Sequence, residues 1–320
     1  MSLKHCAVAL AAILLLPTLA NGQDYPTKGI RIVVPFPPGA GNDVQARLLG
    51  KKFTEAMGQP VVVDNRPGAN GLIGAESVAK SQPDGYTLLF TSAGLAANVT
   101  LYKRTGFDPL KDLVGVTLFS IGPHFLVVHP SVPAKSVKDL AAIARKNPGK
   151  LNAGSNGSGA SNHLAIEMFK QLAGVDVTHI PYKGGAPNMN AVLAGEVDFA
   201  FLGATTALPQ IRAGRLRGLA VTSSKPSSAA PHLPTMSSAY PGYEYVNWYA
   251  LFAPAGTATA ILDKLSSEAR KALKSSDVRN LLTAEGIEPA GTTPTEMAAF
   301  FKREVERSAE LIKRAGLKVE

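Results

Sequence analysis

Hydrophobic and polar positions alternate along the chain in short blocks, and many of these blocks predict a strand followed by a helix. Residues 30–49 begin with a β-branched run, pass through a loop rich in Pro and Gly, and continue with apolar residues at helical spacing. We expect a strand, an open loop and a helix here, with Asn42 or Asp43 as the helix cap. Most such joints only connect two elements, but the partly positive amides at the helix start also make the loop a candidate anion site.

A second segment, residues 151–180, repeats this pattern 116 residues further along the chain. The matched pairs are Gly41 and Gly157, Leu48 and Leu164, Phe53 and Phe169, Gly58 and Gly174, and Val61 and Val177. The repeat predicts two glycine-rich loops, each preceding a helix, that face each other across a cleft.

Other blocks extend the alternation of strands and helices through most of the chain. Strands are expected at residues 59–65, 86–91, 177–181, 197–202, 216–222 and 245–253. Helices are expected after Ser136, Thr257 and Thr293, between Gly184 and Gly195, and in shorter stretches. This order predicts an α/β fold with mostly parallel sheets flanked by helices. Ligands bind such sheets beyond the carboxyl ends of strands, which places residues 36–43 and 91–94 on one rim.

The apolar stretch at residues 115–130 is interrupted by Gly122 and Pro123, where we expect the chain to cross into a second domain. A Pro- and Ser-rich loop at residues 225–241 is expected to lead back. Lobe 1 then comprises residues 23–122 and 226–320, and the inserted lobe 2 comprises residues 123–225. Two crossings form a hinge, and a hinge between lobes allows a cleft to close.

Residues 1–22 have the pattern of a cleaved secretory signal peptide, with a charged start at Lys4, an apolar run and small residues before the cut. The apolar run is too short to span a bilayer. The one cysteine, Cys6, lies inside it, so we expect a processed protein without thiols or disulfides. These features predict export to the periplasm of a bacterium.

The composition is that of an ordinary globular protein, with 45% hydrophobic and 18% charged residues and a formal net charge of +9. The Lys and Arg residues are scattered, without an aromatic-interleaved basic stripe, and export also argues against a nucleic-acid partner. An anionic solute is compatible with a basic surface.

An enzyme is the alternative that the first loop leaves open. Gly39-x-Gly41 after a strand, with Asp64 at the end of the next strand, approaches a dinucleotide-binding fingerprint. Val44 replaces the third small residue, and three prolines crowd the turn where a pyrophosphate needs close backbone approach. The alternative function is thus an exported dinucleotide-binding oxidoreductase.

Hydrolytic and metal chemistry have less support in the sequence. The serines of the second loop fail the G-x-S-x-G pattern. His163 and Glu167 form a helical i,i+4 pair, which we interpret as a surface contact, and His179 alternates within a strand as a half-buried structural residue. We therefore expect no catalytic residues, no metal site and no cofactor.

Binding without chemistry explains more of the second loop. Ser155, Asn156, Ser158 and Ser161 place short hydrogen-bond donors at a helix start, a composition suited to a carboxylate or phosphate. Capping alone is the simpler role for any one of these serines. Neither glycine loop contains Arg or Lys, so the attraction for an anion is expected to come from helix ends and amides.

Several motifs together resemble the extracytoplasmic receptors of the tripartite tricarboxylate transporters, the Bug (Bordetella uptake gene) group. They are IRIVVPFPPGAGND, VVVDNRPGANGLIGAESVAKSQPDGYTLLFTS, LNAGSNGSGASNHLAIEMFKQLAGVDVTHIPYKGG, EVDFAFLG and NWYALFAPAGT. The likeness covers essentially all of the processed chain.

The resemblance implies a two-lobed, type II-like periplasmic-binding-protein fold that captures a small organic acid between its lobes. The ligand classes it implies are di- and tricarboxylates, amino acids and aromatic acids, held by backbone amides and Ser/Thr hydroxyls for uptake or sensing. It implies the membrane subunits of a transporter as a partner. We expect the protein itself to be a monomer, with no nucleic-acid partner. The implied contacts are Phe36, Gly41, Asn42, Asp43 and Ser92 in lobe 1 and Ser155, Ser158, Ser161, Gly184, Gly185 and Thr205 in lobe 2.

The first loop departs from the family pattern, which often has Gly-Gly before a Ser/Thr-Asp pair. Here the order is Gly39-Ala40-Gly41-Asn42-Asp43, so contacts at Ala40 and Asn42 are expected to differ. Asp43 is interpreted as a cap, with a ligand amine as the alternative partner. Phe36 and Trp248 either line an aromatic slot or belong to the core.

Overall fold

The computed structural model describes residues 25–102, 106–284 and 286–317, so the predicted signal peptide lies outside the described residues. Within these ranges, one mixed sheet runs in the order β2-β1-β3-β9-β4-β7-β5-β6, and β8 and β10 also pair with β4. The strands are β1 (Ile30–Val34), β2 (Val61–Asn65), β3 (Thr87–Ser92), β4 (Leu113–Val128), β5 (Asn152–Ser155), β6 (Thr178–Pro181), β7 (Phe199–Gly203), β8 (Arg217–Val221), β9 (Val246–Pro254) and β10 (Glu288–Pro289).

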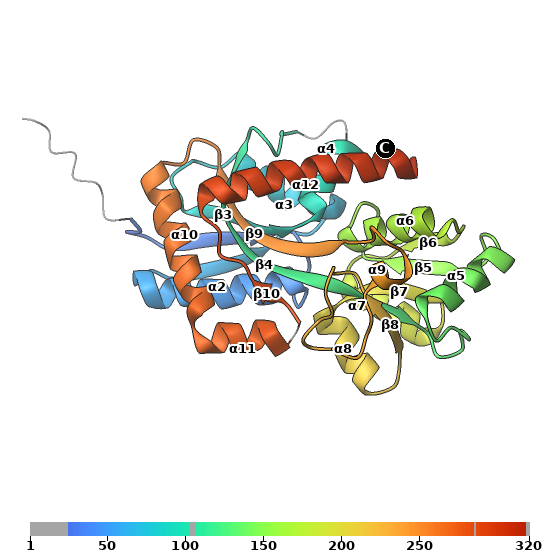
Figure 1. The fold of residues 1–320 in the computed structure, drawn as a ribbon. Helices are drawn as coiled ribbons and strands as arrows, with labels where there is room; N and C mark the ends of the chain where they lie inside the picture. The colour runs from blue at the N-terminus through green and yellow to red at the C-terminus, as the bar shows by residue number, and fades with distance from the viewer. Residues whose placement is uncertain (1–24, 103–105, 285, 318–320) are drawn as a thin grey trace, which may run out of the picture.

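Helices flank the sheet along its length (Figure 1). They are α2 (Gly41–Met57), η1 (Ala69–Gly71), α3 (Leu72–Ala79), α4 (Gly94–Leu101), α5 (Val137–Lys146), α6 (Ser161–Ala173), α7 (Gly185–Ala194), α8 (Ala204–Arg212), α9 (Met236–Ala239), α10 (Thr259–Lys274), α11 (Ser276–Ala284) and α12 (Pro294–Ala315). Strands β1, β2 and β3 pair in parallel, as do β5, β6 and β7, whereas β9 and β4 are antiparallel to their neighbours. The predicted α/β fold is confirmed.

Strand β4 joins the two parallel groups and corrects one expectation. Gly122 and Pro123 do not split the apolar stretch, because β4 is continuous over 16 residues. Up to Pro123 it pairs with β9, and from His124 onward it pairs with β7 and β8. Proline has no N–H to donate to a ladder, and it stands where the strand changes partners. The chain therefore passes between the groups within one strand, and the lobe boundaries stay a prediction.

Most helix ends match the sequence signals. Gly58, Gly174 and Gly195 follow α2, α6 and α7 in the left-handed conformation that glycine adopts without a steric cost. Helix α12 begins with a capping box in which Thr293 and Glu296 bond to each other's backbone N–H groups. The predicted cap of α5 by Ser136 is also present.

The internal repeat holds for the helix bodies but not for the loops. Phe53 of α2 and Phe169 of α6 are both fully buried. However, α2 starts at Gly41, whereas Gly157 lies in the loop four residues before the start of α6 at Ser161. The pairing of Gly41 with Gly157 was therefore wrong in structural terms, because α6 has 13 residues and α2 has 17, although both end at the matched glycines Gly58 and Gly174.

The core comprises separate apolar clusters on the two groups of strands. Trp248 is fully buried against Phe300 and Phe301, and its Nε1 donates to Glu304, so it belongs to the core and not to an aromatic slot. Of the helices in the described ranges, none combines the length and apolar character that a bilayer crossing requires.

Candidate functional site

A cavity of about 260 Å³ lies where the N-termini of five helices converge. The first residues of α2, α4, α6, α7 and α8 all line it; they are Gly41, Gly94, Ser161, Gly185 and Ala204. None of these five helices has a side-chain hydrogen bond at its N-cap. Their first-turn amides are thus left without a capping side chain, and the helix dipoles add partial positive charge. The arrangement suits an anion.

Eight residues implied by the family resemblance lie in the wall of this cavity. They are Phe36, Gly41, Asn42, Ser92, Ser161, Gly184, Gly185 and Thr205. They come from both parallel groups of strands, since the first four precede β4 and the last four follow it. Their contacts with a ligand stay a prediction.

Asp43 lies outside the cavity wall and is not the cap of α2. The N-cap is Ala40, and Asn42 and Asp43 are already helical. The Asp43 carboxylate is buried, and it accepts hydrogen bonds from the Gly39 N–H at 2.9 Å, from Arg47 Nε at 3.1 Å and from Asn65 Nδ2 at 2.9 Å. The Asp43 side chain therefore stabilises the conformation of the first loop without facing the cavity, and its negative charge is paired with Arg47.

These bonds also set the ionisation of the carboxyl group. Burial by itself would raise the pKa of Asp43, but the bonds from Arg47, Gly39 and Asn65 outweigh burial and hold the pKa below its ordinary value. A carboxyl group with a lowered pKa in the folded state adds stability above the unfolded-state pKa, and this stability disappears as the pH falls through the folded-state pKa.

Replacing Asp43 with asparagine is expected to lower the free energy of unfolding at pH 7 by about 1–3 kcal/mol, because an amide cannot accept all of these bonds. The difference from the unmodified protein should shrink below about pH 4, where Asp43 of the unfolded chain begins to take up a proton, and should continue to shrink as the pH falls through the lowered pKa of the folded state. Denaturant unfolding at pH 7 and pH 3 measures both effects. Asp263→Asn, at an exposed position of α10, is the control, and an equal loss in both variants would contradict the assignment.

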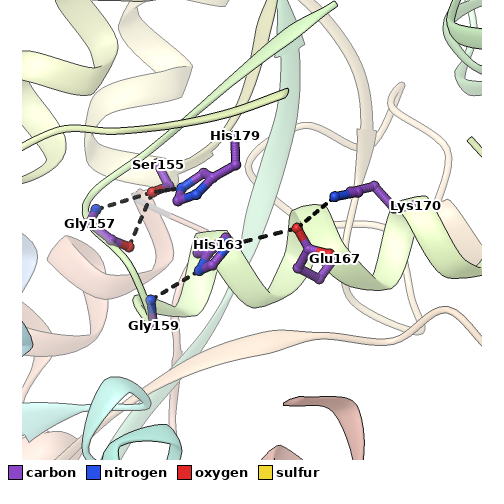
Figure 2. Close-up of polar contacts among 7 residues, drawn as sticks. All are labelled: Ser155, Gly157, Gly159, His163, Glu167, Lys170 and His179. Carbon is purple, nitrogen blue, oxygen red and sulfur yellow. Dashed lines mark hydrogen bonds and ion pairs between the residues drawn. The ribbon is translucent and has the colours of Figure 1, made fainter. Parts of the chain in front are cut away.

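Ser155 and Ser158 are also absent from the cavity wall. Ser155 is fully buried, and its Oγ lies 2.5 Å from His179 Nε2 and 3.1 Å from the backbone N and O of Gly157 (Figure 2). Its hydroxyl therefore holds the second loop from inside and is not available to a molecule in the cavity.

Asn156, the residue after Ser155, lies in the cavity wall and is held there by hydrogen bonds. Its side chain accepts a bond from Asn188, and its backbone N–H donates to Asn162, whose amide in turn donates to the Phe201 carbonyl. Asn162 and Asn188 are fully buried. These bonds fix Asn156 in the cavity wall.

Strand residues that the sequence reading missed complete the wall, among them His124, Asn247 and Tyr249. His124 is buried, with its Nε2 3.0 Å from Ser161 Oγ, and burial lowers the pKa of its imidazole to about 4. It is therefore neutral at pH 7. A single histidine in an apolar strand is indistinguishable from a core residue by pattern alone.

Three buried polar atoms in the wall have no hydrogen-bond partner within the described part of the chain. They are Asn42 Nδ2, His124 Nδ1 and Asn247 Oδ1. Buried polar groups are usually satisfied, and leaving one unpaired costs about 1–3 kcal/mol. A bound molecule that offers acceptors as well as a donor would compensate these groups.

Lys183 also belongs to the cavity wall, at an exposed position before α7. Attraction for an anion at this site thus includes one cationic side chain in addition to the helix ends.

Tyr249 makes a close approach to the start of α2. A Cβ atom on Gly41 would lie 2.7 Å from the Tyr249 hydroxyl oxygen, a distance too short for two unbonded atoms. Both residues line the cavity, so the packing of the tyrosine depends on glycine at this position.

The histidines do not form a metal site in the ranges that the structure describes, where no three His, Cys, Asp or Glu side chains gather. His163 and Glu167 are nevertheless not the surface pair that the sequence suggested, because both are buried. The i,i+4 spacing on a helix was predicted correctly. However, the face of α6 that carries His163 and Glu167 packs against the second loop and against β6, where His179 stacks on His163.

Comparison with known proteins agrees with this fold. A model of the tripartite tricarboxylate transporter family receptor, TctC, matches residues 45–317. Protein BugT of Bordetella pertussis is 37% identical over 302 residues, covering 93% of each chain. The structure of R. palustris Rpa4515 with adipate has a TM-score of 0.88 and 36% identity over 92% of this chain and 100% of that chain. MatC from Rhodopseudomonas palustris with bound malate has a TM-score of 0.84 and 30% identity over 90% of this chain and 100% of that chain.

The resemblance read from the motifs is therefore confirmed, and so is the match to periplasmic binding proteins. The family model covers far more than half of the chain, and the relatives align over nearly their whole length. On these grounds the chain belongs to the family of tripartite tricarboxylate transporter receptors, the TctC or Bug proteins.

Proposed function

We propose that the protein is a periplasmic receptor that binds a small organic carboxylate in the 260 Å³ cavity and presents it for uptake or sensing. The observation that carries the proposal is the convergence of five helix N-termini without capping side chains. A carboxylate oxygen accepts hydrogen bonds from such amides and gains from the aligned dipoles. Hydroxyl groups in the wall, such as Ser92 and Ser161, supply further donors.

The size of the cavity and the neighbouring structures support a ligand of a few carbons. At about 30 Å³ for each water molecule in the liquid, the volume holds roughly nine waters, which suits a short acid. Two similar proteins carry adipate and malate. We extend that ligand class, the dicarboxylates, to this protein, with tricarboxylates, acidic amino acids and aromatic acids as further members to be tested.

The oxidoreductase alternative has no observation in its favour. Asp64, which would bind a ribose, lies outside the cavity wall and pairs with Arg66 at 2.8 Å and Arg31 at 3.6 Å. The cavity volume of about 260 Å³ lies below the range typical of sites for drug-sized ligands, about 300–1,000 Å³, and a dinucleotide is larger than such ligands. We accordingly propose a receptor without a catalytic step, acting as a monomer after loss of residues 1–22, with transporter membrane subunits as its partner.

A thermal unfolding screen tests the proposal. Adipate, malate, citrate, glutamate and benzoate are compared with the neutral diamide of adipate and with NAD. A ligand that binds only the folded state at 100 times its Kd stabilises it by about 2.7 kcal/mol, which for a protein of this size raises Tm by several degrees.

We expect at least one carboxylate to raise Tm and the diamide to have no effect, because the amide lacks the charge that the helix ends attract. A response to NAD alone would favour the oxidoreductase. Equal responses to the acid and its diamide would contradict the assignment of the helix N-termini.

A further inference from the structure

A largely buried polar network joins the second loop to α6 and β6 (Figure 2), and none of its labelled residues lines the cavity. The rings of His163 and His179 stack with a centroid distance of 3.7 Å and an angle of 12° between their planes. His163 Nδ1 accepts a hydrogen bond from the Gly159 N–H at 3.0 Å, and this bond is buried. Because an imidazole nitrogen accepts only when it carries no proton, Nδ1 of His163 is unprotonated here.

Gly159 lies close to α4 and η1, which belong to the part of the chain that contains β1, β2 and β3. A Cβ atom on this glycine would lie 2.5 Å from Leu101 Cδ1 of α4 and 3.1 Å from Asn70 Nδ2 of η1. Its φ of +78° also favours glycine. The backbone of the loop therefore packs directly on α4 and η1, and Asn70 itself lines the cavity.

The loop continues from this contact into the cavity wall. Ala160 and Ser161 follow Gly159, and both line the cavity, with Ser161 as the first residue of α6. The position of the Gly159 amide thus determines where the α6 N-terminus meets a ligand.

On the proposed function we base one further inference. We propose that His163 is a positioning residue for ligand binding: its unprotonated Nδ1 holds Gly159 against Asn70 and Leu101 and so fixes the start of α6 at the cavity. A side chain at this position that lacks the acceptor would leave the buried Gly159 N–H unpaired and release the loop, and ligand affinity would fall.

The charged and titratable groups that face His163 come from α6 and β6. Glu167 Oε1 lies 3.7 Å from His163 Nε2 and 3.2 Å from Lys170 Nζ. Burial would raise the pKa of Glu167, but its bond to His163 and the Lys170 charge hold the pKa below its ordinary value, so the carboxylate stays ionised. Burial, and then the neighbouring His163, lower the pKa of His179 to about 3, so the stacked ring remains neutral at mild acidity.

Two variants separate the hydrogen bond from the bulk of the ring. His163→Asn keeps an acceptor at the position of Nδ1, whereas His163→Phe keeps a ring against His179 but has no acceptor. Kd for adipate and malate is measured by calorimetry at pH 7.5.

At pH 7.5 we expect the Asn variant to bind within about threefold of the unmodified protein and the Phe variant to bind about tenfold more weakly, the cost of a buried N–H without an acceptor. Recovery of affinity in the Asn variant, but not in the Phe variant, assigns the effect to the acceptor. A role confined to stability would lower Tm but leave Kd the same in all three proteins.

Hydrogen exchange at the Gly159 amide gives a readout that needs no ligand. Exchange should be faster in His163→Phe than in His163→Asn and the unmodified protein. Equal exchange in all three, or a Phe variant that binds as tightly as the unmodified protein, overturns the inference. If the unmodified protein binds neither acid, the exchange experiment still decides the role of His163, and the proposed function fails separately.

Discussion

Replacing Gly41 with alanine is expected to weaken the binding of adipate or malate by about 10- to 100-fold. The new Cβ would lie 2.7 Å from the Tyr249 hydroxyl oxygen, so either the first turn of α2 or the tyrosine must move. Overpacking of this kind costs about 1–3 kcal/mol, and about 1.4 kcal/mol corresponds to a tenfold change in Kd. Because both residues line the cavity, the cost falls on ligand binding. Calorimetric titration measures it.

A second substitution provides the control for this result. Tyr249→Phe removes the oxygen that the new methyl group would meet, so the double variant should recover most of the affinity that Gly41→Ala loses. The single Tyr249→Phe variant completes a double-mutant cycle with the unmodified protein, Gly41→Ala and the double variant. It corrects for any direct contact of the hydroxyl with the ligand. Strictly additive effects of the two substitutions would contradict a steric origin.

Truncation of Phe53 or Phe169 to alanine is expected to lower the free energy of unfolding by about 3–5 kcal/mol in each case. Both side chains are fully buried at equivalent positions of α2 and α6, and Phe169 packs edge-on against Phe199 and Tyr240. A cavity of that size in a packed core is only partly filled by relaxation of its neighbours. Denaturant unfolding, followed by circular dichroism, measures the loss.

Leu172→Ala is the matched control on α6, because this leucine is 41% exposed and should cost less than about 1 kcal/mol. If either phenylalanine variant behaves like this control, the repeat does not place equivalent core residues in the two helices. Unfolding in two separate transitions would require each to be fitted separately.

The helix boundaries and the strand-helix alternation were predictable because their causes are local. Gly58, Gly174 and Gly195 each end a helix through a backbone conformation that the residue itself favours. The capping box at Thr293 needs only a partner three residues away. Such signals are complete within a few positions of the sequence.

Elements whose surroundings come from elsewhere in the chain were missed. Helix α4 is buried on most of its faces, so it lacks the alternation of apolar and polar residues that marks a surface helix. Strand β4 stays intact through Pro123 because β9, more than 100 residues further on, pairs with it up to that proline. Neither cause is visible in the local pattern.

In the candidate site, too, the features with local causes were predicted and those that depend on distant residues were not. The glycine-rich loops were recognisable, since they combine turn residues with a helix start. The contact of Ser155 with His179 was not predicted, because His179 lies 24 residues away on another strand. His124 and Tyr249 reach the cavity from strands, where their pattern resembles that of core residues.

The five uncapped helix starts have a consequence for how such a receptor can evolve. The main-chain amides that attract a negative charge are encoded by no particular side chain, so most point mutations leave them in place. Changes at Phe36, His124 or Lys183 alter the shape and polarity of the wall around that unchanged anchor. Preference for one acid over another can therefore diverge between descendants while the requirement for an acid group is inherited intact.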